Sequence, residues 1–374
     1  MTDFRTAQPV GTRRRALMWL AGAGAAASLL PGAVHAADAA DAALIKAAQA
    51  EGALNTIALP PDWANYGVII STFQKKYGIG INNAAPDDSS AQELQSIRSM
   101  RGQSRGPDVV DVGPSFALIG ASEGLFRPYK VATWDSIPAN MKDPGGLWWG
   151  DYFGLVSLGV NRSVAKTAPR TWADLKKPEY KGMVALNGSP LGAGAAFAAV
   201  MAASIANGGS LDDIMPGIAY FAELAKLGNF NPTSATAASI VSGQTPVVVN
   251  WDYLNLAQAK KSKGMVAIDT IIPEGARPYG AFYCQAISKY APHPQAAELW
   301  EEFLYSDDGQ ILFLQGFAHP ARFADMVKRG VISNSLMADL PPPGPYAEAL
   351  FADNEQSKKA QAALAANWTK MVKA

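Results

Sequence analysis

Four side chains capable of ligand contact directly follow a short β-branched run. Residues 247–249 are three valines that fit a buried parallel strand, and Asn250, Trp251, Asp252 and Tyr253 come next. In open α/β sheets, a ligand lies just beyond the carboxyl ends of the strands. Trp251 and Tyr253 could supply flat apolar walls, and Asp252 could supply a charge for an ammonium group. The structural alternative makes Asp252 a helix N-cap and leaves Trp251 half-buried.

A second segment has the composition of an anion site. Residues 189–194, Ser-Pro-Leu-Gly-Ala-Gly, end a predicted strand and open a predicted helix, and their glycines expose backbone N–H groups. The positive end of the helix dipole there favours a carboxylate, phosphate or phosphonate. A dinucleotide-binding loop is a poor interpretation, because Ala-Ala-Phe follows Gly194 and the third small residue of that fingerprint is missing.

Residues 120–124, Gly-Ala-Ser-Glu-Gly, match the G-x-S-x-G pattern of a hydrolase nucleophile elbow. The elbow needs a strand before the serine, whereas residues 116–119 have helical character. His293 and His319 are the histidines that follow the first 36 residues, and His293 stands between two prolines. We therefore interpret Ser122 as part of a turn at a helix end. The sequence contains no H-E-x-x-H, Walker or Cys/His zinc spacing, so no enzyme activity, metal or cofactor is expected.

The elements that would position these residues alternate between helix and strand. Helical patterns at 39–50, 66–77, 89–103 and 116–122 alternate with extended segments at 54–59, 79–83 and 108–112, and Ser90 and Glu93 have capping-box spacing. This alternation predicts a parallel sheet with helices on both faces.

The second half of the chain continues the mixed pattern. Strands are predicted at 148–160, 183–187, 265–272 and 279–287, and helices at 193–207, 211–227, 234–242 and 295–305. Gly243 should cap the helix before it. The last helix of that set should continue over 309–317, and residues 348–373 form a terminal helical region. Residues 341–345, Pro-Pro-Pro-Gly-Pro, are interpreted as a rigid linker.

The chain has 374 residues, a length that suits two lobes rather than one core. Residues 12–18 resemble a twin-arginine motif, an Ala/Leu-rich stretch of about 15 residues follows, and Val34-His35-Ala36 offers small residues for signal peptidase. The apolar stretch is shorter than the roughly 20 residues that span a bilayer. We therefore expect export, cleavage near Ala36, and a mature protein in the periplasm.

The net charge and the cysteine content argue against a nucleic-acid-binding protein and against a disulfide-stabilised one. Removal of residues 1–36 takes four of the 32 basic side chains and one of the 32 acidic ones, which leaves a net charge of about −3. A protein with this net charge has no excess of basic side chains for binding nucleic acid. Cys284 is the single cysteine, so an internal disulfide is excluded and a packed small residue is expected.

Three motifs resemble those of a known family. Residues 159–162 (Gly-Val-Asn-Arg), 169–175 (Pro-Arg-Thr-Trp-Ala-Asp-Leu) and 178–182 (Pro-Glu-Tyr-Lys-Gly) resemble the extracellular solute-binding proteins of ABC importers. The group is the one with iron(III)-, thiamine-, polyamine- and 2-aminoethylphosphonate-binding members. Residues 281–288 and 296–310 resemble its returning strand and late helix, so the resemblance covers essentially the whole mature chain. Trp172, Leu175 and Tyr180 are interpreted as scaffold, with Gly182 allowing the next turn.

The resemblance implies an α/β fold of the type 2 periplasmic binding proteins. Two lobes, each a central β-sheet flanked by helices, would be joined by two crossover strands near residues 152–161 and 279–288. The expected parts are lobe 1 at 37–155, lobe 2 at 156–278, and a return to lobe 1 with C-terminal helices at 279–374. The lobes would close on a small-molecule solute by hinge motion. A monomer working with a cognate ABC permease of the inner membrane is expected.

In this family, ligand contacts come from loops at strand ends that face the cleft. Each matching position also has a structural alternative as a cap or core residue. The positions are Asp62, Trp63, Asn65, Tyr66, Pro114, Ser115, Tyr152, Phe153, Ser189, Gly192, Ala193, Gly194, Asn250, Trp251, Asp252, Tyr253, Tyr279 and Phe282.

The residue types indicate the chemistry of the solute. Aromatic rings with Asp252 and Asp62 suit an ammonium group, and the turn at 189–194 suits an anion. An aminoalkylphosphonate or an amino acid-like compound would satisfy both ends. A polyamine would use only the acidic and aromatic end, and residues 281–285 lack the acidic residue of polyamine-binding relatives.

Ferric iron is the alternative ligand. The resemblance implies that iron-binding relatives carry adjacent tyrosines where this chain has Trp251-Asp252-Tyr253, and an indole cannot coordinate a metal. A hard Fe(III) site could still be assembled from Tyr66, Asp252, Tyr253 and Tyr279.

Overall fold

The computed structural model describes residues 42–373. The expected export signal, residues 1–36, and its cleavage site at Ala36 lie outside the described residues. Within residues 42–373, no helix has the length and apolar character needed to cross a membrane.

The first elements alternate as predicted. Their order is α1 (Ala42–Glu51), β1 (Ala53–Ile57), α2 (Tyr66–Tyr77), β2 (Gly80–Ala84), α3 (Ser90–Ser99), β3 (Val109–Val112) and α4 (Pro114–Ser122). β1 and β2 pair in parallel. α2 has the predicted bounds and ends at Gly78, whose φ of 71° is the left-handed conformation that favours glycine.

The predicted capping box of α3 is wrong by one residue. Ser89 is the N-cap, and its backbone N–H donates to the side chain of Gln92 at 2.9 Å. Ser90 and Glu93 are buried instead, because they hold the end of β3: Glu93 Oε2 accepts from the backbone N–H of Asp111 at 3.0 Å.

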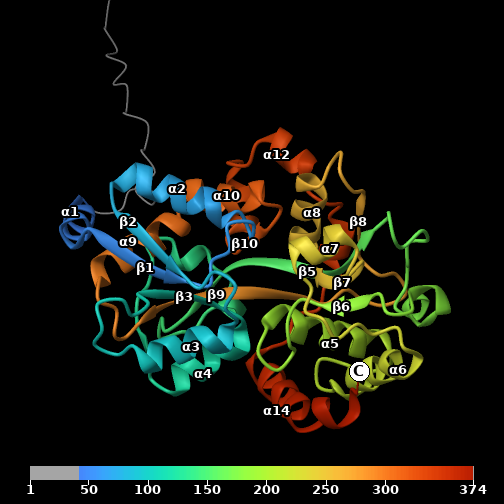
Figure 1. Cartoon of the computed structure of the whole chain (residues 1–374). Helices are drawn as coiled ribbons and strands as arrows, with labels where there is room; N and C mark the ends of the chain where they lie inside the picture. The colour runs from blue at the N-terminus through green and yellow to red at the C-terminus, as the bar shows by residue number, and fades with distance from the viewer. Residues whose placement is uncertain (1–41, 374) are drawn as a thin grey trace, which may run out of the picture. The chain divides into compact units, whose positions relative to one another are not determined.

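β5 (Trp149–Asn161) is shared by two groups of elements (Figure 1). It follows β4 (Phe126–Arg127) and the short helices η1 (Trp134–Ser136) and η2 (Ala139–Met141). Up to Leu155, β5 pairs antiparallel with β9 (Gly280–Ser288), and from Val156 onward it pairs antiparallel with β7 (Val247–Trp251) and β8 (Ile268–Ile271). β9 also pairs with β3. β5 and β9 are therefore the two crossover strands.

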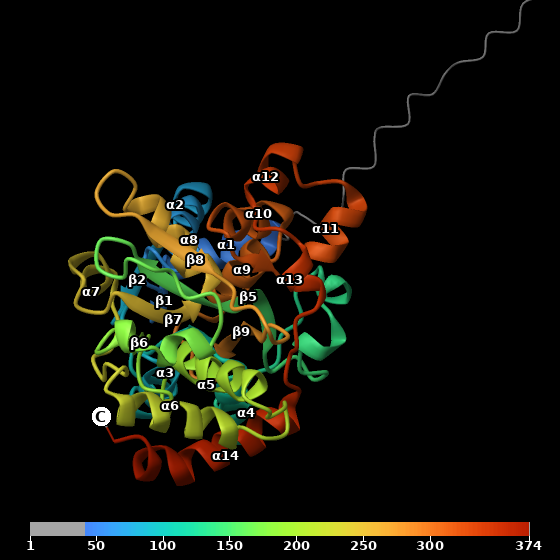
Figure 2. The ribbon, with the colours of Figure 1, turned by 90° about the vertical axis from the view of Figure 1, so that its right-hand side faces the viewer.

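The second group contains η3 (Ala173–Lys176), η4 (Pro178–Tyr180), β6 (Val184–Leu186), α5 (Gly194–Ala206), α6 (Met215–Leu227), α7 (Ala237–Ser242) and α8 (Asp252–Lys261). α5 and α6 lie on one side of β6 and β7, and α8 lies on the other (Figures 1 and 2). Trp172, Leu175 and Tyr180 are buried. The Tyr220 hydroxyl donates to the carbonyl of Trp172 at 2.6 Å, so this segment is fixed to α6.

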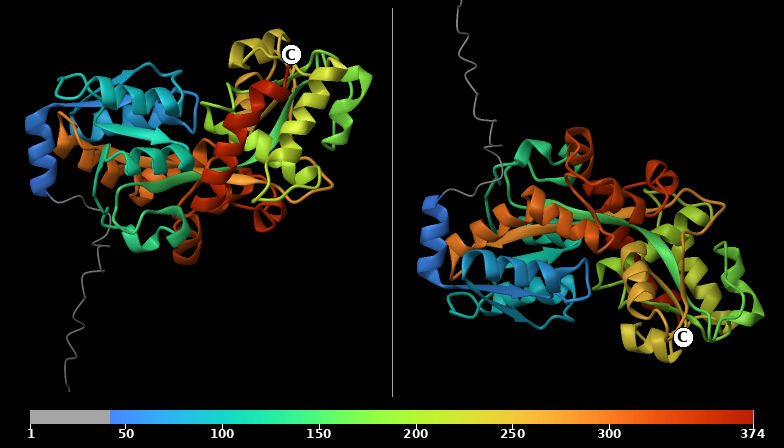
Figure 3. Two further views of the ribbon diagram at one scale, coloured as in Figure 1. Left: turned by 90° about the horizontal axis from the view of Figure 1, so that it is seen from below. Right: turned by 90° about the horizontal axis from the view of Figure 1, so that it is seen from above.

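The C-terminal part returns to the first group and then crosses back. It contains α9 (Pro294–Leu304), α10 (Asp307–Gln315), β10 (His319–Pro320), α11 (Phe323–Arg329), α12 (Asn334–Asp339), α13 (Gly344–Ala347) and α14 (Asn354–Met371). α14 contacts both α4 and α6 and lies across them when viewed from below (Figure 3).

Two predictions for this part are wrong. The helix at 295–305 does not continue over 309–317, because Ser306 caps a separate helix and accepts from the backbone N–H of Gly309 at 3.1 Å. Residues 341–345 are not only a linker, because Gly344 begins the helical turn α13, and the Tyr346 ring of that turn lies 4.1 Å from the ring of His319.

The prediction of a parallel sheet is only partly right. Among the named strands, parallel pairing occurs between β1 and β2 and between β6 and β7. The other pairs are antiparallel, because β5 leaves the first group and β9 returns to it in the opposite direction. Cys284 is buried in β9 and free, as expected.

Candidate functional site

The strand that carries Trp251 is longer than predicted. Asn250 and Trp251 still belong to β7 and pair with Ser157 and Val156 of β5. Asn250 Oδ1 accepts from Asn187 Nδ2 at 3.2 Å. Since side chains alternate along a strand, Trp251 points to the opposite face, where its Nε1 lies 3.5 Å from the hydroxyl of Tyr283.

Asp252, the first residue of α8, is buried and bonded to donors of the protein itself. Its Oδ1 accepts from the backbone N–H groups of Leu155 and Tyr253, both at 2.9 Å, and its Oδ2 accepts from the hydroxyl of Tyr346. Burial raises the pKa of Asp252 to about 6, and these hydrogen bonds limit the rise. Asp252 thus ties α8 to β5 and α13. The structural alternative is wrong in detail, because Trp251 is the N-cap residue of α8 and is buried rather than half-buried.

A cavity lies where the two groups of elements meet beside β9. Its volume of about 20 Å³ has room for one or two water molecules. Its walls come from the starts of α4 and α5, the end of β7, the start of β9 and the segment that leads into α14. The lining residues are Gly113, Pro114, Ser115, Gly194, Phe197, Ala198, Trp251, Tyr279, Gly280, Ala281, Phe282, Tyr283, Phe351, Ala352 and Ser357. None of them is charged, so polar contacts would come from hydroxyl and backbone groups.

Two helices begin at one wall of this cavity. A Cβ added to Gly113, the N-cap of α4, would lie 3.6 Å from Gly194 Cα. A Cβ added to Gly194, the first residue of α5, would lie 3.1 Å from the hydroxyl of Tyr283. The N–H groups of a first helical turn have no acceptor within the helix and carry partial positive charge. Two such helix ends and a phenol therefore meet at one point, which can receive an anion.

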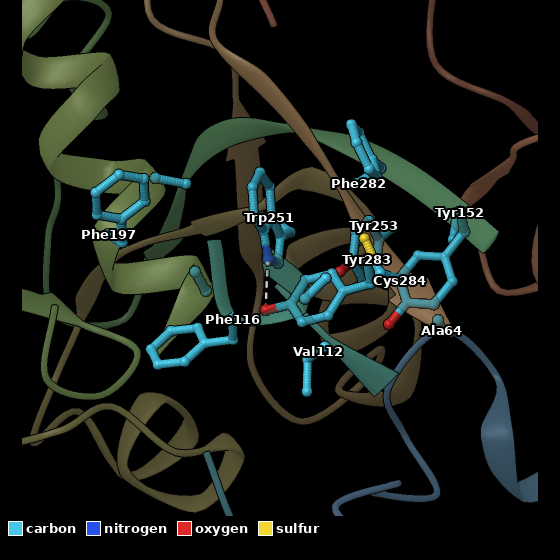
Figure 4. Packing of buried hydrophobic residues seen from close by; sticks show 14 of the residues in the cluster. Ala64, Val112, Phe116, Tyr152, Phe197, Trp251, Tyr253, Phe282, Tyr283 and Cys284 are labelled. Atoms are coloured by element: carbon cyan, nitrogen blue, oxygen red, sulfur yellow. Dashed lines mark hydrogen bonds between the residues drawn. The ribbon is translucent and has the colours of Figure 1, made fainter. Parts of the chain in front are cut away.

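Four rings from four elements pack together next to the cavity; we call Trp63, Tyr152, Tyr253 and Tyr283 the aromatic box. The Tyr152 ring centroid lies 5.6 Å from those of both Tyr253 and Tyr283. The Trp63 centroid lies 5.5 Å from that of Tyr283 and 6.2 Å from that of Tyr253. Trp251 is stacked on Tyr253 at 6.3 Å and so joins the box to the cavity. Figure 4 shows Trp251, Tyr253, Tyr283 and Tyr152 gathered between their elements.

Two carboxylates adjoin the box. Asp111 Oδ2 accepts from the hydroxyls of Tyr66 and Tyr152, both at 2.9 Å. Asp151 Oδ2 accepts from Gln285 Nε2 at 2.9 Å. Burial raises the pKa of Asp151 to about 7, and burial, followed by the charge of Asp151, raises the pKa of Asp111. Two acidic groups therefore lie next to the aromatic rings, and a cation placed beside them would favour their ionised forms.

The structure brings one part of the predicted site set together. Pro114, Ser115, Gly194, Trp251, Tyr279 and Phe282 line the cavity, and Trp63, Tyr152 and Tyr253 belong to the aromatic box. The predicted residues that lie outside both are Asp62, Asn65, Tyr66, Phe153, Ser189, Gly192, Ala193, Asn250 and Asp252.

The outlying residues have other partners. Asp62 is exposed and forms an ion pair with Lys261 of α8. Asn65 Nδ2 donates to the carbonyl of Leu312 at 2.8 Å. The Phe153 ring lies 5.3 Å from that of His319. Ser189 is exposed, and its carbonyl accepts from the N–H groups of Gly192 and Ala193, so this turn satisfies its own backbone.

Sequence reasoning missed residues that the structure places at this region. Asp111 interrupts the apolar run of β3, Val-Val-Asp-Val, and that interruption is a usable signal. Tyr283 is the direct neighbour of Phe282, a predicted position, whereas Asp151 lies in the strand-end segment 151–153 that the family resemblance had indicated. Phe351 and Ser357 carry no such signal, because only the return of the C-terminal segment brings them to the cavity.

Two of the side chains considered for a ferric site, Tyr66 and Asp252, have other partners. The Tyr66 hydroxyl faces Asp111 and Asp151, and Asp252 is bonded to Tyr346. In the described part of the chain, no group of three or more His, Cys, Asp or Glu side chains could hold a metal ion.

Ser122 does not stand on a nucleophile elbow. It is the last residue of α4, and its hydroxyl donates to the carbonyl of Ile119 at 2.8 Å. The segment before it is helical rather than extended, as expected from the sequence.

The fold and this junction define a class: a two-lobed α/β binding protein in which two crossover strands connect the lobes and a hollow lies between them. The family model described as bacterial extracellular solute-binding protein matches residues 105–337. The chain belongs to this family of bacterial extracellular solute-binding proteins. No curated protein matches the chain significantly.

Solved structures of similar fold come from the same class. The periplasmic binding protein AfuA from Actinobacillus pleuropneumoniae, with fructose-6-phosphate bound, is 19% identical with a TM-score of 0.67, over 86% of this chain and 98% of that one. AgtB from A. tumefaciens R10, in complex with agropinic acid, is 16% identical with a TM-score of 0.69, over 86% and 98%. Iron-bound HitA from Pseudomonas aeruginosa is 20% identical with a TM-score of 0.62, over 84% and 97%. At these identities the similarity shows the fold alone.

Proposed function

We propose that this protein captures a small organic solute carrying an ammonium group at one end and an anionic group, such as a phosphonate or carboxylate, at the other. The observation that carries the proposal is the contact between the aromatic box and the wall where α4 and α5 begin. Aromatic faces attract ammonium groups, and helix N-termini attract anions. The two ends of one solute would therefore be bound on either side of Trp251.

The neighbours support the anionic end. AfuA has fructose-6-phosphate bound, and AgtB is in complex with agropinic acid. In this chain the cavity wall offers no basic side chain, so the helix ends and the hydroxyls of Ser115 and Tyr283 would carry the contact.

Capture of a solute requires movement. A cavity of about 20 Å³ is far smaller than the roughly 300–1,000 Å³ of typical small-molecule sites. We propose that lobe 2, residues 156–278 with α14 packed on it, swings away from lobe 1, residues 37–155 and the rest of 279–374, by bending of β5 and β9. The solute then enters and the lobes close on it.

The closed, loaded state would be the form that the permease recognises. In this proposal the protein is exported through the twin-arginine route and cleaved near Ala36. It acts as a monomer, binds no nucleic acid and carries out no reaction on its solute.

A thermal-shift screen on the chain without residues 1–36 tests the proposal. The panel contains amines, amino acids, aminoalkylphosphonates, thiamine, sugar phosphates and ferric complexes. A ligand at 100 times its dissociation constant should add about 2.7 kcal/mol to the free energy of unfolding. Stabilisation by a zwitterionic solute is expected. Stabilisation by ferric complexes alone, or labelling of Ser122 by a fluorophosphonate probe, would contradict the proposal.

A further inference from the structure

We propose that the ammonium group of the solute binds inside the aromatic box, between the free carboxylate oxygen of Asp111 and the hydroxyl of Tyr253. This inference rests on the proposed function and assigns the acidic partner of its cationic end to Asp111, which the sequence did not suggest. It replaces Asp62, which is exposed and paired with Lys261, and Asp252, which is bonded to Tyr346 and to backbone N–H groups.

Tyr152 has an unpaired acceptor and an unpaired hydroxyl among the side chains that contact it. Asp111 Oδ2 accepts two phenol hydroxyls, but Asp111 Oδ1 has no hydrogen-bond partner among the described residues. The Tyr253 hydroxyl is likewise buried without a partner. Both side chains contact Tyr152, Asp111 through the hydroxyl and Tyr253 through the ring. Buried polar groups are almost always paired, so two unpaired ones around one ring indicate a missing donor.

A group of buried acidic side chains also favours a cation at this place. Glu93, Asp111, Asp151 and Glu301 are all buried, and the charge of Asp151 raises the pKa of Asp111 and of Glu301 after the larger effect of burial. A cation would relieve this repulsion, whereas a neutral polyol would leave it unchanged.

No buried basic side chain in residues 42–373 relieves this repulsion in place of a cation. In residues 42–373 the buried basic side chains are Arg322 and His319. Arg322 is paired with Asp307 and Asp325, and burial lowers the pKa of His319 to about 4, so that it is neutral.

The aromatic box also joins the two lobes. Rings from lobe 1 (Trp63), from lobe 2 (Tyr253) and from both crossover strands (Tyr152 and Tyr283) pack against one another, with neighbouring centroids 5.5 to 6.2 Å apart. Trp63 is half-buried, so the box reaches solvent on its side. Separation of Trp63 from Tyr253 would open it, and ring faces would then flank the entering ammonium group, which is the arrangement that favours cations.

The test compares ammonium compounds with uncharged counterparts. Calorimetry uses the chain without residues 1–36 and three pairs: ethanolamine and ethylene glycol, putrescine and 1,4-butanediol, and 2-aminoethylphosphonate and propylphosphonate. We expect at least one ammonium member to bind and its counterpart to bind at least tenfold more weakly. Asp111→Asn should lower the affinity at least tenfold, and Tyr253→Phe, which keeps the ring, should lower it several-fold. Asp308→Asn and Tyr290→Phe are matched controls and should leave it unchanged.

Folding of each variant is verified by circular dichroism and thermal unfolding. Tyr253→Phe keeps the test decisive if Asp111→Asn fails to fold. A second readout is the pH profile: burial raises the pKa of Asp111, so the affinity for the ammonium compound should rise with pH in the wild type as Asp111 ionises. This rise should be smaller in Asp111→Asn.

The outcomes separate the two proposals. If a solute without an ammonium group, such as glucose 6-phosphate, binds tightly and no ammonium compound does, the receptor function stands and this inference is overturned. Unchanged affinity for an ammonium compound in both Asp111→Asn and Tyr253→Phe overturns it as well. If no solute of any class binds, the proposed function itself fails.

Discussion

At Gly194 the lack of a side chain allows the start of α5 to approach Tyr283 and the start of α4. An added Cβ would lie 3.1 Å from the Tyr283 hydroxyl and 3.7 Å from Gly113 Cα. Larger side chains would also fill the space in front of the two helix ends. Gly192 is less constrained by its neighbours, because an added Cβ there would lie no nearer than 3.8 Å to any of them.

We therefore predict that Gly194→Val weakens solute binding at least tenfold while the fold is retained. The valine would separate the helix N-terminus from the anionic group of the solute. Calorimetry measures the affinity, and Gly192→Ala is the matched control with the wild-type value expected. Equal affinities in wild type and Gly194→Val would show that the anionic end does not lie at this wall.

The buried carboxyl groups also set the pH dependence of stability. Burial raises the pKa of Asp151 to about 7 and that of Asp252 to about 6, from the ordinary value of 3.8. Between about pH 4 and pH 7 the folded chain therefore holds more protons than the unfolded chain, and stability must fall as the pH rises through that range. His319, whose pKa burial lowers to about 4, acts in the opposite direction over the same range.

Since several carboxyl groups oppose one histidine, we predict a larger free energy of unfolding at about pH 5 than at about pH 7.5. Urea unfolding at both values measures it. Asp252→Asn should reduce the difference, because the amide does not titrate. A difference of opposite sign, or one that Asp252→Asn leaves unchanged, would contradict this account.

At the scale of elements, α14 is the part that joins the two groups across the site. Its Trp368 ring lies 5.7 Å from that of Phe221 in α6, and Gln361 Nε2 donates to Ser115 Oγ of α4 at 2.9 Å. Aromatic packing is worth more than a single half-buried hydrogen bond. α14 should therefore stay with α6, and its contact with α4 should be the one that breaks when the lobes separate.

Trp368→Ala should lower the free energy of unfolding by about 3 kcal/mol, because it removes a buried aromatic side chain from α6. Chemical denaturation measures the change, and Lys370→Ala, on the exposed side of the same helix, should be neutral within about 0.5 kcal/mol. A neutral Trp368→Ala would mean that α14 contributes little to lobe 2.

At the scale of the molecule, several contacts hold the lobes together on the side of α8. Besides the hydrogen bond from Tyr346 to Asp252, they include the Asp62–Lys261 ion pair, the Trp63–Tyr253 ring contact and the Lys260–Phe317 cation–π contact. The ion pair is largely exposed, so it is worth at most about 1 kcal/mol and salt should weaken it further. The Trp63–Tyr253 ring contact should therefore stabilise the closed form more than the ion pair does.

We predict that Asp62→Asn changes the open-to-closed ratio no more than about fivefold, whereas Trp63→Ala favours the open form clearly. Small-angle scattering without ligand measures the radius of gyration, which should rise in Trp63→Ala and stay close to wild type in Asp62→Asn. A larger rise in Asp62→Asn than in Trp63→Ala would reverse the assignment of the main closing contact.

Several features of the fold could be predicted from local patterns in the sequence. The bounds of α2, the cap at Gly243 and the burial of Trp172, Leu175 and Tyr180 follow from periodicity, from the φ > 0 positions that glycine tolerates, and from apolar side chains in a loop. The motifs around residues 159–182 also indicated the family. For the site, the sequence predicted that Trp251 and Gly194 share one hollow, since both follow strands that end at the same edge.

Tertiary structure alone decided which polar groups are free to meet a ligand. Asp252 follows the valine-rich strand β7 and Asp111 lies within the valine-rich strand β3, but neither position shows locally whether the carboxylate is paired. Asp252 is bonded because α13 returns with Tyr346, more than 90 residues later, while one oxygen of Asp111 stays unpaired because no donor among the described residues reaches it. The antiparallel return of β9, and the arrival of Phe351 at the cavity, likewise depend on contacts between segments far apart in the chain, which no local pattern encodes.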